Sequence, residues 1–180
     1  MTAAVLLCAG GSRRFGQPPK LLAPFRGRPL VTWALEHVWA AGLDEVLVVV
    51  GPVDLSAFLP GVVVVDNPAW ASGQASSLRA GLAAAEARGH EVVVVGLGDQ
   101  PLVPPEAWSA VANTASPIAV ANFDGKRTPP TRLARSVWGL LPEHGDTGAR
   151  TLMQARPDLV VEVPCPGEAL DIDVKDDLLS

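Results

Sequence analysis

The fold is decided by the opening stretch AAVLLCAGGSRRFGQPPKLL, residues 3–22, where an unbroken apolar run leads into a loop rich in glycine and positive charge. Further apolar runs, rich in β-branched residues, follow at 46–50, 62–65, 92–95 and 118–121. Because most of these runs are continuous rather than alternating, they are typical of strands buried on both faces of a sheet.

Segments of helical character lie between the runs, at 30–41, 76–88 and 105–114. Gly42 and Gly89 follow the first two segments and Pro104 and Pro105 introduce the third, which is how glycine and proline mark helix ends and starts. Strand and helix therefore alternate along the chain. This alternation predicts an α/β fold with a mainly parallel sheet.

The region after Phe123 has a looser pattern. DGKRTPPTRLARS, residues 124–136, is a turn-rich basic stretch, after which we expect helices at about 133–141 and 146–154, a strand at 169–173 and a short helical end. We expect this region to cover an edge of the sheet. No linker or repeat interrupts the sequence, so the prediction is one domain over residues 1–180.

Composition limits the classes of function. Hydrophobic residues make up 48% and charged residues 18% of the chain, so a folded core is expected. The net charge of -5 gives no reason to bind nucleic acid or an anionic membrane, and no apolar stretch approaches the roughly 20 residues of a membrane span. Only Cys8 and Cys165 are cysteines, and no basic region precedes the first apolar run, which predicts a cytoplasmic protein.

The glycine-rich loop is the first candidate site, because ligands bind beyond the carboxyl ends of the strands in an open parallel sheet. Gly10 and Gly11 let the backbone approach a ligand closely, and N–H groups exposed in such a loop can cradle phosphate. Arg14 and Lys20 would offset the charge of a triphosphate. A solvated glycine-rich turn is the alternative explanation of the same letters.

Two common phosphate-binding motifs do not fit this loop. Gly11 and Gly16 have the spacing of a Walker loop, but Gln17 and Pro18 stand where lysine and serine or threonine are required. A dinucleotide fingerprint needs glycines at other offsets and an early helix, which Pro18 and the proline after it block. The loop is therefore of another kind.

The second candidate is Asp99 in VVVVGLGDQPLV, residues 92–103, where an apolar run ends on the same rim of the predicted sheet. Mg²⁺ prefers one or two carboxylates together with phosphate oxygens, so Asp99 is a natural ligand for that ion. The alternative is an aspartate that starts a turn or caps the helix near Pro104.

A third candidate segment is NPAWASGQASSLRAGL, residues 67–82. Gly73 permits an unusual backbone angle, and Ser76 or Ser77 is expected to cap the helix that follows, whose N-terminal N–H groups could face an anion. Capping alone would explain the serines equally well.

A fourth candidate lies near the end of the sequence, in DIDVKDD, residues 171–177. Asp171 and Asp173 are two residues apart, so on a strand both carboxylates would point to one face. Two adjacent carboxylates repel unless a cation lies between them, which favours a metal ligand over a solvated acidic end.

Five ordered segments together resemble the nucleotidyltransferase family that includes molybdenum cofactor cytidylyltransferase and its guanylyltransferase relative. The matching segments are LCAGGSRRFG at 7–16 with the lysine at 20, GQASSLRAGL at 73–82, GDQP at 98–101, GDTGAR at 145–150 and DIDVKDDL at 171–178. Their order and spacing cover nearly the whole chain, which makes them far more specific together than any one alone.

The resemblance implies a Rossmann-like three-layer sandwich with a mostly parallel central sheet, of the nucleotide-diphospho-sugar transferase type, that binds a nucleoside triphosphate and Mg²⁺. Carried over position by position, it assigns nucleotide binding to Ala9, Gly10, Gly11, Ser12, Arg14, Lys20, Gly73 and Ser77. It assigns catalysis to Lys20, Arg14 and Asp99. It assigns the metal to Asp99 and Asp173, with Asp171 and Asp146 as alternatives for the second ligand.

The activity that the resemblance implies is transfer of a nucleoside monophosphate to the phosphate of an acceptor such as the molybdenum cofactor, with release of pyrophosphate. An apoenzyme that receives the finished cofactor would be a further partner. With Leu7 aligned, the loop reads Cys8, Ala9, Gly10, which is the pattern of the cytidylyl branch and favours CTP.

Several positions depart from the family pattern. Phe15 replaces a methionine, QPPK contains an extra proline, and VKDD replaces TPED. RTPPT, residues 127–131, stands where the family often has a His-Pro-Val segment, in the region expected to bind the acceptor. The identity of the acceptor therefore stays open.

Two alternatives to cytidylyl transfer remain. One is a guanylyl or uridylyl transferase that acts on another phosphorylated cofactor precursor or a sugar phosphate. The other is a module that binds the nucleotide or cofactor without turnover, such as a chaperone that hands over a cofactor. The presence of both Lys20 and Asp99 favours an enzyme.

Overall fold

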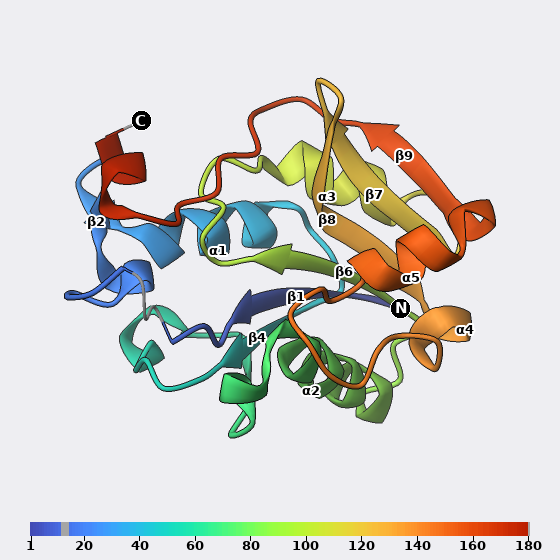
Figure 1. Cartoon of the computed structure of the whole chain (residues 1–180), viewed down its shortest axis with the longest axis horizontal. Helices are drawn as coiled ribbons and strands as arrows, with labels where there is room; N and C mark the ends of the chain where they lie inside the picture. The colour runs from blue at the N-terminus through green and yellow to red at the C-terminus, as the bar shows by residue number, and fades with distance from the viewer. Residues whose placement is uncertain (12–14, 180) are drawn as a thin grey trace.

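A seven-stranded sheet forms the centre of the molecule in the computed structural model, which describes residues 1–11 and 15–179 (Figure 1). The strand order is β5-β4-β1-β6-β8-β7-β9. The strands are β1 (Thr2–Cys8), β4 (Glu45–Val50), β5 (Val63–Asp66), β6 (Val92–Leu97), β7 (Ile118–Phe123), β8 (Lys126–Ala134) and β9 (Val160–Pro164). Two short strands, β2 (Pro24–Phe25) and β3 (Arg28–Pro29), form a separate antiparallel pair.

Most strand pairs in the central sheet are parallel. β1 runs parallel to β4 and to β6, β4 is parallel to β5, and β7 is parallel to β9. Only β8 runs against its neighbours, β6 and β7. The carboxyl ends of β1, β4 and β6 therefore meet at one edge of the sheet, where loops converge.

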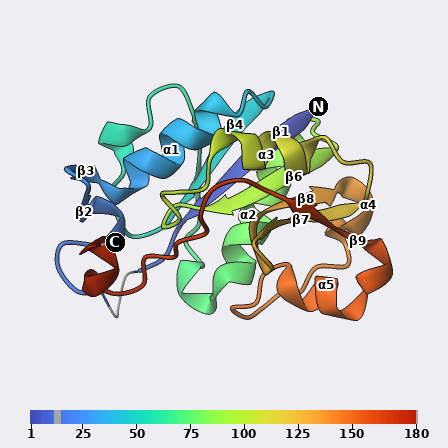
Figure 2. The ribbon, with the colours of Figure 1, turned by 90° about the horizontal axis from the view of Figure 1, so that it is seen from above.

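Helices cover both faces of this sheet, as Figure 2 shows from above. α1 (Leu30–Ala40) and α3 (Pro105–Ala112) pack on one face, while α2 (Gln74–Ala87), α4 (Arg135–Trp138) and α5 (Arg150–Ala155) pack on the other. Short 3₁₀ helices lie at Lys20–Leu22, Ser56–Phe58, Trp70–Ser72, Pro157–Leu159 and Lys175–Leu179. The predicted Rossmann-like three-layer sandwich is confirmed.

Alternate side chains of β1 are buried on opposite faces of the sheet, which explains why helices cover both faces. Ala4 and Leu6 face the core beneath α1 and α3, whereas Ala3 and Val5 face the core beneath α2. All four side chains are fully buried. Burying an aliphatic side chain of this kind on each face stabilises the fold by about 1.5–3 kcal/mol for a valine or leucine, which fixes both helical layers against one strand.

The region after Phe123 corrects several predictions. Residues 124–136 do not cover a sheet edge as a turn-rich stretch, because most of them form β8 inside the sheet. The helix expected at 133–141 is reduced to α4, and the one expected at 146–154 starts later, as α5. β9 was not predicted.

Two prolines explain why β8 was not predicted. The pairing of β7 with β8 shifts register between Val120, which pairs with Thr131, and Ala121, which pairs with Thr128. Pro129 and Pro130 occupy that irregularity. Proline cannot donate to a strand ladder, but a bulge requires no ladder hydrogen bond from it.

The segment at 169–173 is not a strand, so the expectation that Asp171 and Asp173 share one strand face is wrong. The backbone N–H of Ile172 donates to the Asp99 carbonyl (3.1 Å), and the Ile172 side chain is fully buried. The final residues form the short helical end that was predicted, at Lys175–Leu179. Across residues 1–11 and 15–179, no helix is long and apolar enough to cross a membrane.

Candidate active site at the carboxyl end of the sheet

A cavity of about 480 Å³ opens where β1 and β6 end. The residues that follow β1, the 3₁₀ helix Trp70–Ser72 and the first turn of α2 form its walls. The polar side chains at its lining are Lys20, Gln74, Ser77, Asp99, Asp146 and Asp173. The predicted glycine loop and the predicted Asp99 therefore face the same cavity.

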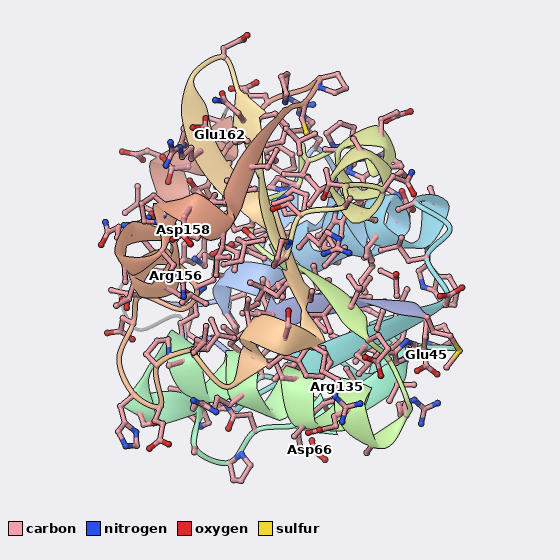
Figure 3. The ribbon with its side chains drawn as sticks, turned by 90° about the vertical axis from the view of Figure 1, so that its right-hand side faces the viewer. Glu45, Asp66, Arg135, Arg156, Asp158 and Glu162 are labelled. Atoms are coloured by element: carbon pink, nitrogen blue, oxygen red, sulfur yellow. The ribbon has the colours of Figure 1, made fainter. Side chains whose placement is uncertain are left out.

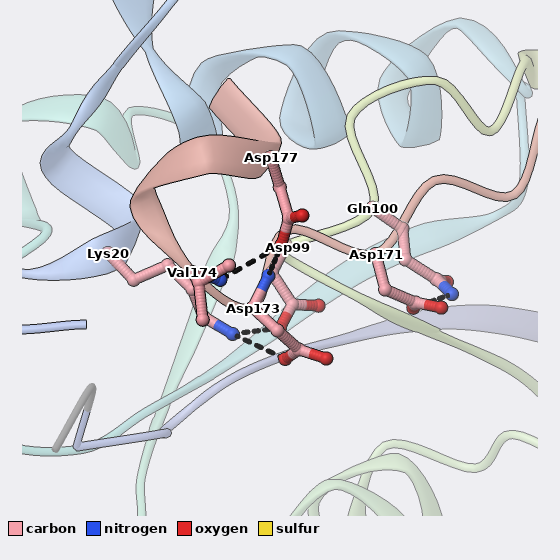
Figure 4. A network of polar contacts seen from close by, with 7 residues as sticks. All are labelled: Lys20, Asp99, Gln100, Asp171, Asp173, Val174 and Asp177. Carbon is pink, nitrogen blue, oxygen red and sulfur yellow. Dashed lines mark hydrogen bonds and ion pairs between the residues drawn. The ribbon is translucent and has the colours of Figure 1, made fainter. Parts of the chain in front are cut away.

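At the lining of this cavity, one ammonium group contacts two carboxylates (Figure 4). Lys20 Nζ lies 2.6 Å from Asp99 Oδ2 and 3.6 Å from Asp173 Oδ1. The side chains of Lys20 and Asp99 are 17% and 23% exposed, whereas that of Asp173 is 68% exposed. The Lys20–Asp99 pair is thus partly withdrawn from water, while Asp173 reaches it from the solvent side.

Local packing places each member of this group. Lys20 opens a 3₁₀ helix whose next residue, Leu21, is buried in the core. Asp99 follows β6 by two residues. Asp173 follows the buried Ile172, and its backbone N–H donates to Asp177 Oδ2 (2.7 Å). Each side chain is therefore held by a neighbour fixed in the core or by a local hydrogen bond.

The electrostatic environment distinguishes Asp99 from an ordinary surface carboxylate. Burial raises the pKa of the Asp99 carboxyl; the Lys20 ammonium opposes this shift, and the carboxylates of Asp171 and Asp173 add to it. Burial and then the charge of Asp99 raise the pKa of the Cys8 thiol. Cys8 is therefore a packed apolar side chain rather than a thiolate nucleophile.

Asp171 lies in a different set of contacts, on the other side of Asp99 (Figure 4). Gln100 Nε2 donates to Asp171 Oδ1 (2.6 Å) and to the Thr128 hydroxyl (2.8 Å), and Lys126 Nζ donates to Asp171 Oδ2 (3.2 Å). Both carboxylate oxygens of Asp171 thus have partners. Of the candidates for the second metal ligand, Asp173 is the one whose carboxylate shares a cation with Asp99.

Asp146, in the loop before α5, packs against the N-terminus of α2. Its Oδ1 accepts from the Gln74 backbone N–H (3.3 Å), and the neighbouring Gly145 carbonyl accepts from the Ala75 N–H (2.9 Å). Gly73 precedes the helix with a φ of 113°, and a Cβ there would lie 2.6 Å from Asp146 Oδ1. The GDTGAR segment therefore docks on the helix start, and only glycine fits beneath it.

The expectation that Ser76 or Ser77 caps α2 is wrong, because the helix starts earlier, at Gln74. The Ser76 hydroxyl donates to the Gly73 carbonyl (2.8 Å), and the buried Ser77 hydroxyl accepts from Asn67 Nδ2 (3.0 Å). Ser77 still lines the cavity. These contacts join the Asn67 turn to the first turn of α2.

The glycine loop approaches an aromatic side chain. Ala9 is buried, Gly10 is exposed, and a Cβ on Gly11 would lie 2.4 Å from Trp70 Cζ3. The absence of a side chain at Gly11 thus lets the indole lie directly against the loop. Two predicted nucleotide ligands, Ser12 and Arg14, lie outside the described residues.

The sequence did not predict one residue of the cavity wall and one that contacts Asp171 beside it. Trp70 lines the cavity, and Gln100 is buried with its Oε1 unpartnered among the described atoms. The five tryptophans are scattered along the sequence, so no pattern marks Trp70 as a site residue. A signal for Gln100 existed, since it is the third letter of GDQP.

A second cavity, of about 640 Å³, adjoins the first. Leu7, Gln74 and Leu97 line both cavities. Its other walls come from β8, including Thr128, Pro129 and Thr131, and from the segment 147–150 before and at the start of α5. The divergent RTPPT segment therefore faces this second cavity.

The donor set suits Mg²⁺ better than a metal held by protein alone. Within residues 1–11 and 15–179, no group of three or more His, Cys, Asp or Glu side chains is arranged to hold a metal ion. Mg²⁺ usually takes one or two carboxylates and completes its shell with phosphate oxygens and water. The Asp99 and Asp173 carboxylates, already gathered around one cation, fit that requirement.

A mostly parallel sheet with a glycine loop and a carboxylate at the carboxyl ends of adjacent strands is an arrangement suited to a nucleotidyltransferase of the α/β class, which must hold a triphosphate and its metal. Residues 4–160 match the family described as the MobA-like NTP transferase domain, and the chain belongs to that family. The predicted family is confirmed.

The relatives carry different names. Nicotine blue oxidoreductase of Paenarthrobacter nicotinovorans is 35% identical over 94% of this chain and 90% of its own length. Purine catabolism protein PucB of Bacillus subtilis is 32% identical over 96% and 92%. Molybdenum cofactor guanylyltransferase of Ectopseudomonas mendocina is 32% identical over 67% and 59%.

Solved structures agree with this family. Rv0371c of Mycobacterium tuberculosis H37Rv superposes with a TM-score of 0.83 and 31% identity, covering 98% of this chain and 94% of that one. The same protein was also solved in complex with manganese, with a TM-score of 0.81, 29% identity and coverage of 98% and 95%.

Proposed function

We propose that the protein is a Mg²⁺-dependent nucleotidyltransferase that moves a nucleoside monophosphate, CMP from CTP, onto the phosphate of a small cofactor of the molybdopterin type. Pyrophosphate is the other product. The observation that carries this proposal is the ammonium of Lys20 between Asp99 and Asp173, inside a cavity walled by the glycine loop. Family membership supports the reaction class.

The chemistry needs no general base, because an acceptor phosphate is already ionised near neutral pH and can attack the α-phosphate directly. Catalysis then rests on positioning and on neutralising charge. Asp99 and Asp173 would hold the divalent ion, which would supply charge neutralisation for the phosphates when it is bound. A manganese complex of the structural relative Rv0371c supports a divalent cation.

The chain's own groups would divide the remaining tasks. Gly10 and Gly11 would let the loop backbone reach the triphosphate, and Lys20 would neutralise charge that builds on the α-phosphate and the pyrophosphate. Arg14, on the same loop, is proposed to assist it. Gly73 and Ser77, at the start of α2, would form the wall of the nucleotide site next to Trp70.

The second cavity is the proposed acceptor site. It shares a wall with the first, so a phosphate at the junction near Gln74 would approach the bound nucleotide. Arg150 lines this cavity and would attract an acidic acceptor. The relative named molybdenum cofactor guanylyltransferase supports a molybdopterin-type acceptor, while CTP rests on the Cys8-Ala9-Gly10 pattern of the loop.

A competing function is suggested by the relative named nicotine blue oxidoreductase. A nicotinamide-dependent reaction would need a dinucleotide site, and the loop after β1 lacks the glycine spacing of the usual fingerprint. The Lys20–Asp99 pair is better suited to a metal-bound triphosphate. Nucleotidyl transfer is therefore favoured.

A pyrophosphate-release assay tests the proposal directly. Each of CTP, GTP, ATP and UTP is supplied with Mg²⁺, with and without molybdopterin, and NADH oxidation is followed in parallel. We expect pyrophosphate only when molybdopterin is present, with CTP as the preferred donor. Release with GTP instead would correct the base, whereas no release with any triphosphate would refute nucleotidyl transfer to this acceptor.

A further inference from the structure

The ammonium of Lys20 stands where the metal would have to act. It is 2.6 Å from Asp99 Oδ2 and 3.6 Å from Asp173 Oδ1, and Figure 4 shows it in contact with both carboxylates. A Mg²⁺ ion bound to the same Asp99 oxygen would sit about 2.1 Å from it, and so within about 5 Å of the ammonium. Two cations at that separation repel strongly in a partly buried site.

We infer that Lys20 competes with the divalent ion for Asp99 and Asp173, so that the metal binds weakly until a triphosphate draws the ammonium away. This inference rests on the proposed function and concerns the order of binding at the same site. Lys20 is thus a binding residue in the loaded site and a competitor in the empty one.

The low solvent exposure of the Lys20–Asp99 pair makes the competition between the ammonium and the metal strong. Because Lys20 and Asp99 are 17% and 23% exposed, neither charge is well solvated when it loses its partner. A metal ion alone would satisfy Asp99 but take that carboxylate away from the ammonium. A triphosphate alone would attract the ammonium but leave the carboxylate stranded.

A metal–triphosphate complex gives both the Asp99 carboxylate and the Lys20 ammonium a new partner of opposite charge. Its cation replaces the ammonium at Asp99 and Asp173, and its phosphate oxygens replace the carboxylates around Lys20. Each ligand therefore makes the binding of the other more favourable. By linkage, the factor by which the triphosphate tightens metal binding equals the factor by which the metal tightens triphosphate binding.

A second lysine–carboxylate pair provides a matched control. Lys126 Nζ lies 3.2 Å from Asp171 Oδ2, but this lysine is 59% exposed and also donates to the Ala169 carbonyl (3.0 Å). Neither Lys126 nor Asp171 lines the first cavity. Removing the Lys126 ammonium should leave metal binding at Asp99 unchanged.

The test measures binding of Mn²⁺ alone, by the loss of the free-ion EPR signal, near neutral pH and without nucleotide. We expect Lys20→Met to bind Mn²⁺ at least about tenfold more tightly than the wild type, because a competing cation has been removed. Lys126→Met should match the wild type. Adding Asp99→Asn to Lys20→Met should remove the gain, which assigns the ion to this site.

Nucleotide dependence completes the experiment. CTP should tighten Mn²⁺ binding to the wild type more than to Lys20→Met, after allowance for Mn²⁺ bound to CTP in solution. Lys20→Gln serves as a second variant, and both variants are first checked for wild-type melting temperature. Equal or weaker Mn²⁺ binding by both lysine variants would overturn the inference.

These outcomes are separate from a failure of the proposed function. Pyrophosphate release by the wild-type protein decides whether it is a nucleotidyltransferase. The EPR titration decides only whether Lys20 competes with the metal. An active enzyme with unchanged Mn²⁺ affinity in the lysine variants would keep the function and reject the competition.

Discussion

Each end of the central sheet carries a carboxylate paired with a basic group, but the pKa is shifted in opposite directions at the two ends. At the amino-terminal end, toward the viewer in Figure 3, Glu45 accepts from Arg88 Nε (2.6 Å) and lies 2.9 Å from His90 Nε2. Hydrogen bonding from Arg88 is the main cause that lowers the pKa of Glu45 to about 2; burial opposes it and His90 adds to it. At the carboxyl end, burial raises the pKa of Asp99 instead.

The difference shows how to separate a stabilising cluster from a binding site. Glu45 is matched by a bidentate guanidinium and a histidine, so its ionised form is favoured in the folded protein. Asp99 shares a single lysine with Asp173. Among the described residues, these two carboxylates therefore share one basic partner where Glu45 has two, and a divalent ion would supply further positive charge.

The largest expected effect is loss of turnover in Asp99→Ala. Removing the carboxylate proposed to hold the metal should lower nucleotidyl transfer by about 10³-fold or more, since the charge it helps neutralise develops in the transition state. The variant should stay folded with a lower melting temperature, because the part-buried Lys20 ammonium loses the Asp99 carboxylate but keeps Asp173 at 3.6 Å. Glu45→Ala is the control and should keep full turnover. Wild-type activity in Asp99→Ala would refute its role.

The next effect concerns two glycines with positive φ, one at each end. Gly73→Ala should destabilise the fold by about 2–3 kcal/mol, because it adds backbone strain to a clash with the Gly145 carbonyl, 2.7 Å from the new Cβ. Gly89→Ala adds only the strain of a φ of 78°, with Met1 Cε at 3.8 Å, so about 1 kcal/mol is expected. Urea unfolding gives both values.

Measuring turnover as well as stability distinguishes the two glycine variants further. Gly73→Ala should reduce activity as well as stability, because the GDTGAR segment borders both cavities and must move. Gly89→Ala should leave activity unchanged. If both variants lose equal stability and neither loses activity, the docking of Asp146 on α2 has no part in the site.

The smallest effect is a pH-dependent change at the amino-terminal end. Since the folded pKa of Glu45 is lowered to about 2, its stabilising contribution is present above its unfolded pKa and disappears as pH falls toward 2. Glu45→Gln should therefore melt lower than the wild type near neutral pH, by about 2–4 °C for a contribution near 1 kcal/mol. The difference should shrink as pH falls below the unfolded pKa and disappear near pH 2, as melting curves from neutral pH down to about pH 2 would show; a constant difference would contradict this account.

The sequence predicted the first half of the fold well. Five apolar runs are strands β1, β4, β5, β6 and β7. Burial on both faces leaves a strong apolar signal in β1, β4, β6 and β7, whereas β5 lies at the sheet edge and is only partly buried, with Val64 48% exposed. β8 could not be recognised, since its two prolines are tolerated only by the bulge opposite Val120 and Ala121. β9 is a short strand whose pairing with β7 depends on the rest of the sheet.

The site was predictable to a similar extent. Lys20 and Asp99 are 79 residues apart, and only their positions after adjacent parallel strands bring them together. The separation of Asp171 from Asp173 was not predictable. It depends on Ile172 being buried between them, which turns one carboxylate toward Gln100 and the other toward Lys20.

The central claim is that Asp99 and Asp173 hold a divalent ion together with a nucleoside triphosphate. An anomalous difference map from crystals of the protein grown with Mn²⁺ and CTP tests it most directly. The account predicts a peak in contact with both carboxylates and with the triphosphate, and Lys20 turned from Asp99 to phosphate. Triphosphate bound in the first cavity with manganese absent from Asp99, and Lys20 still paired to it, would contradict the account.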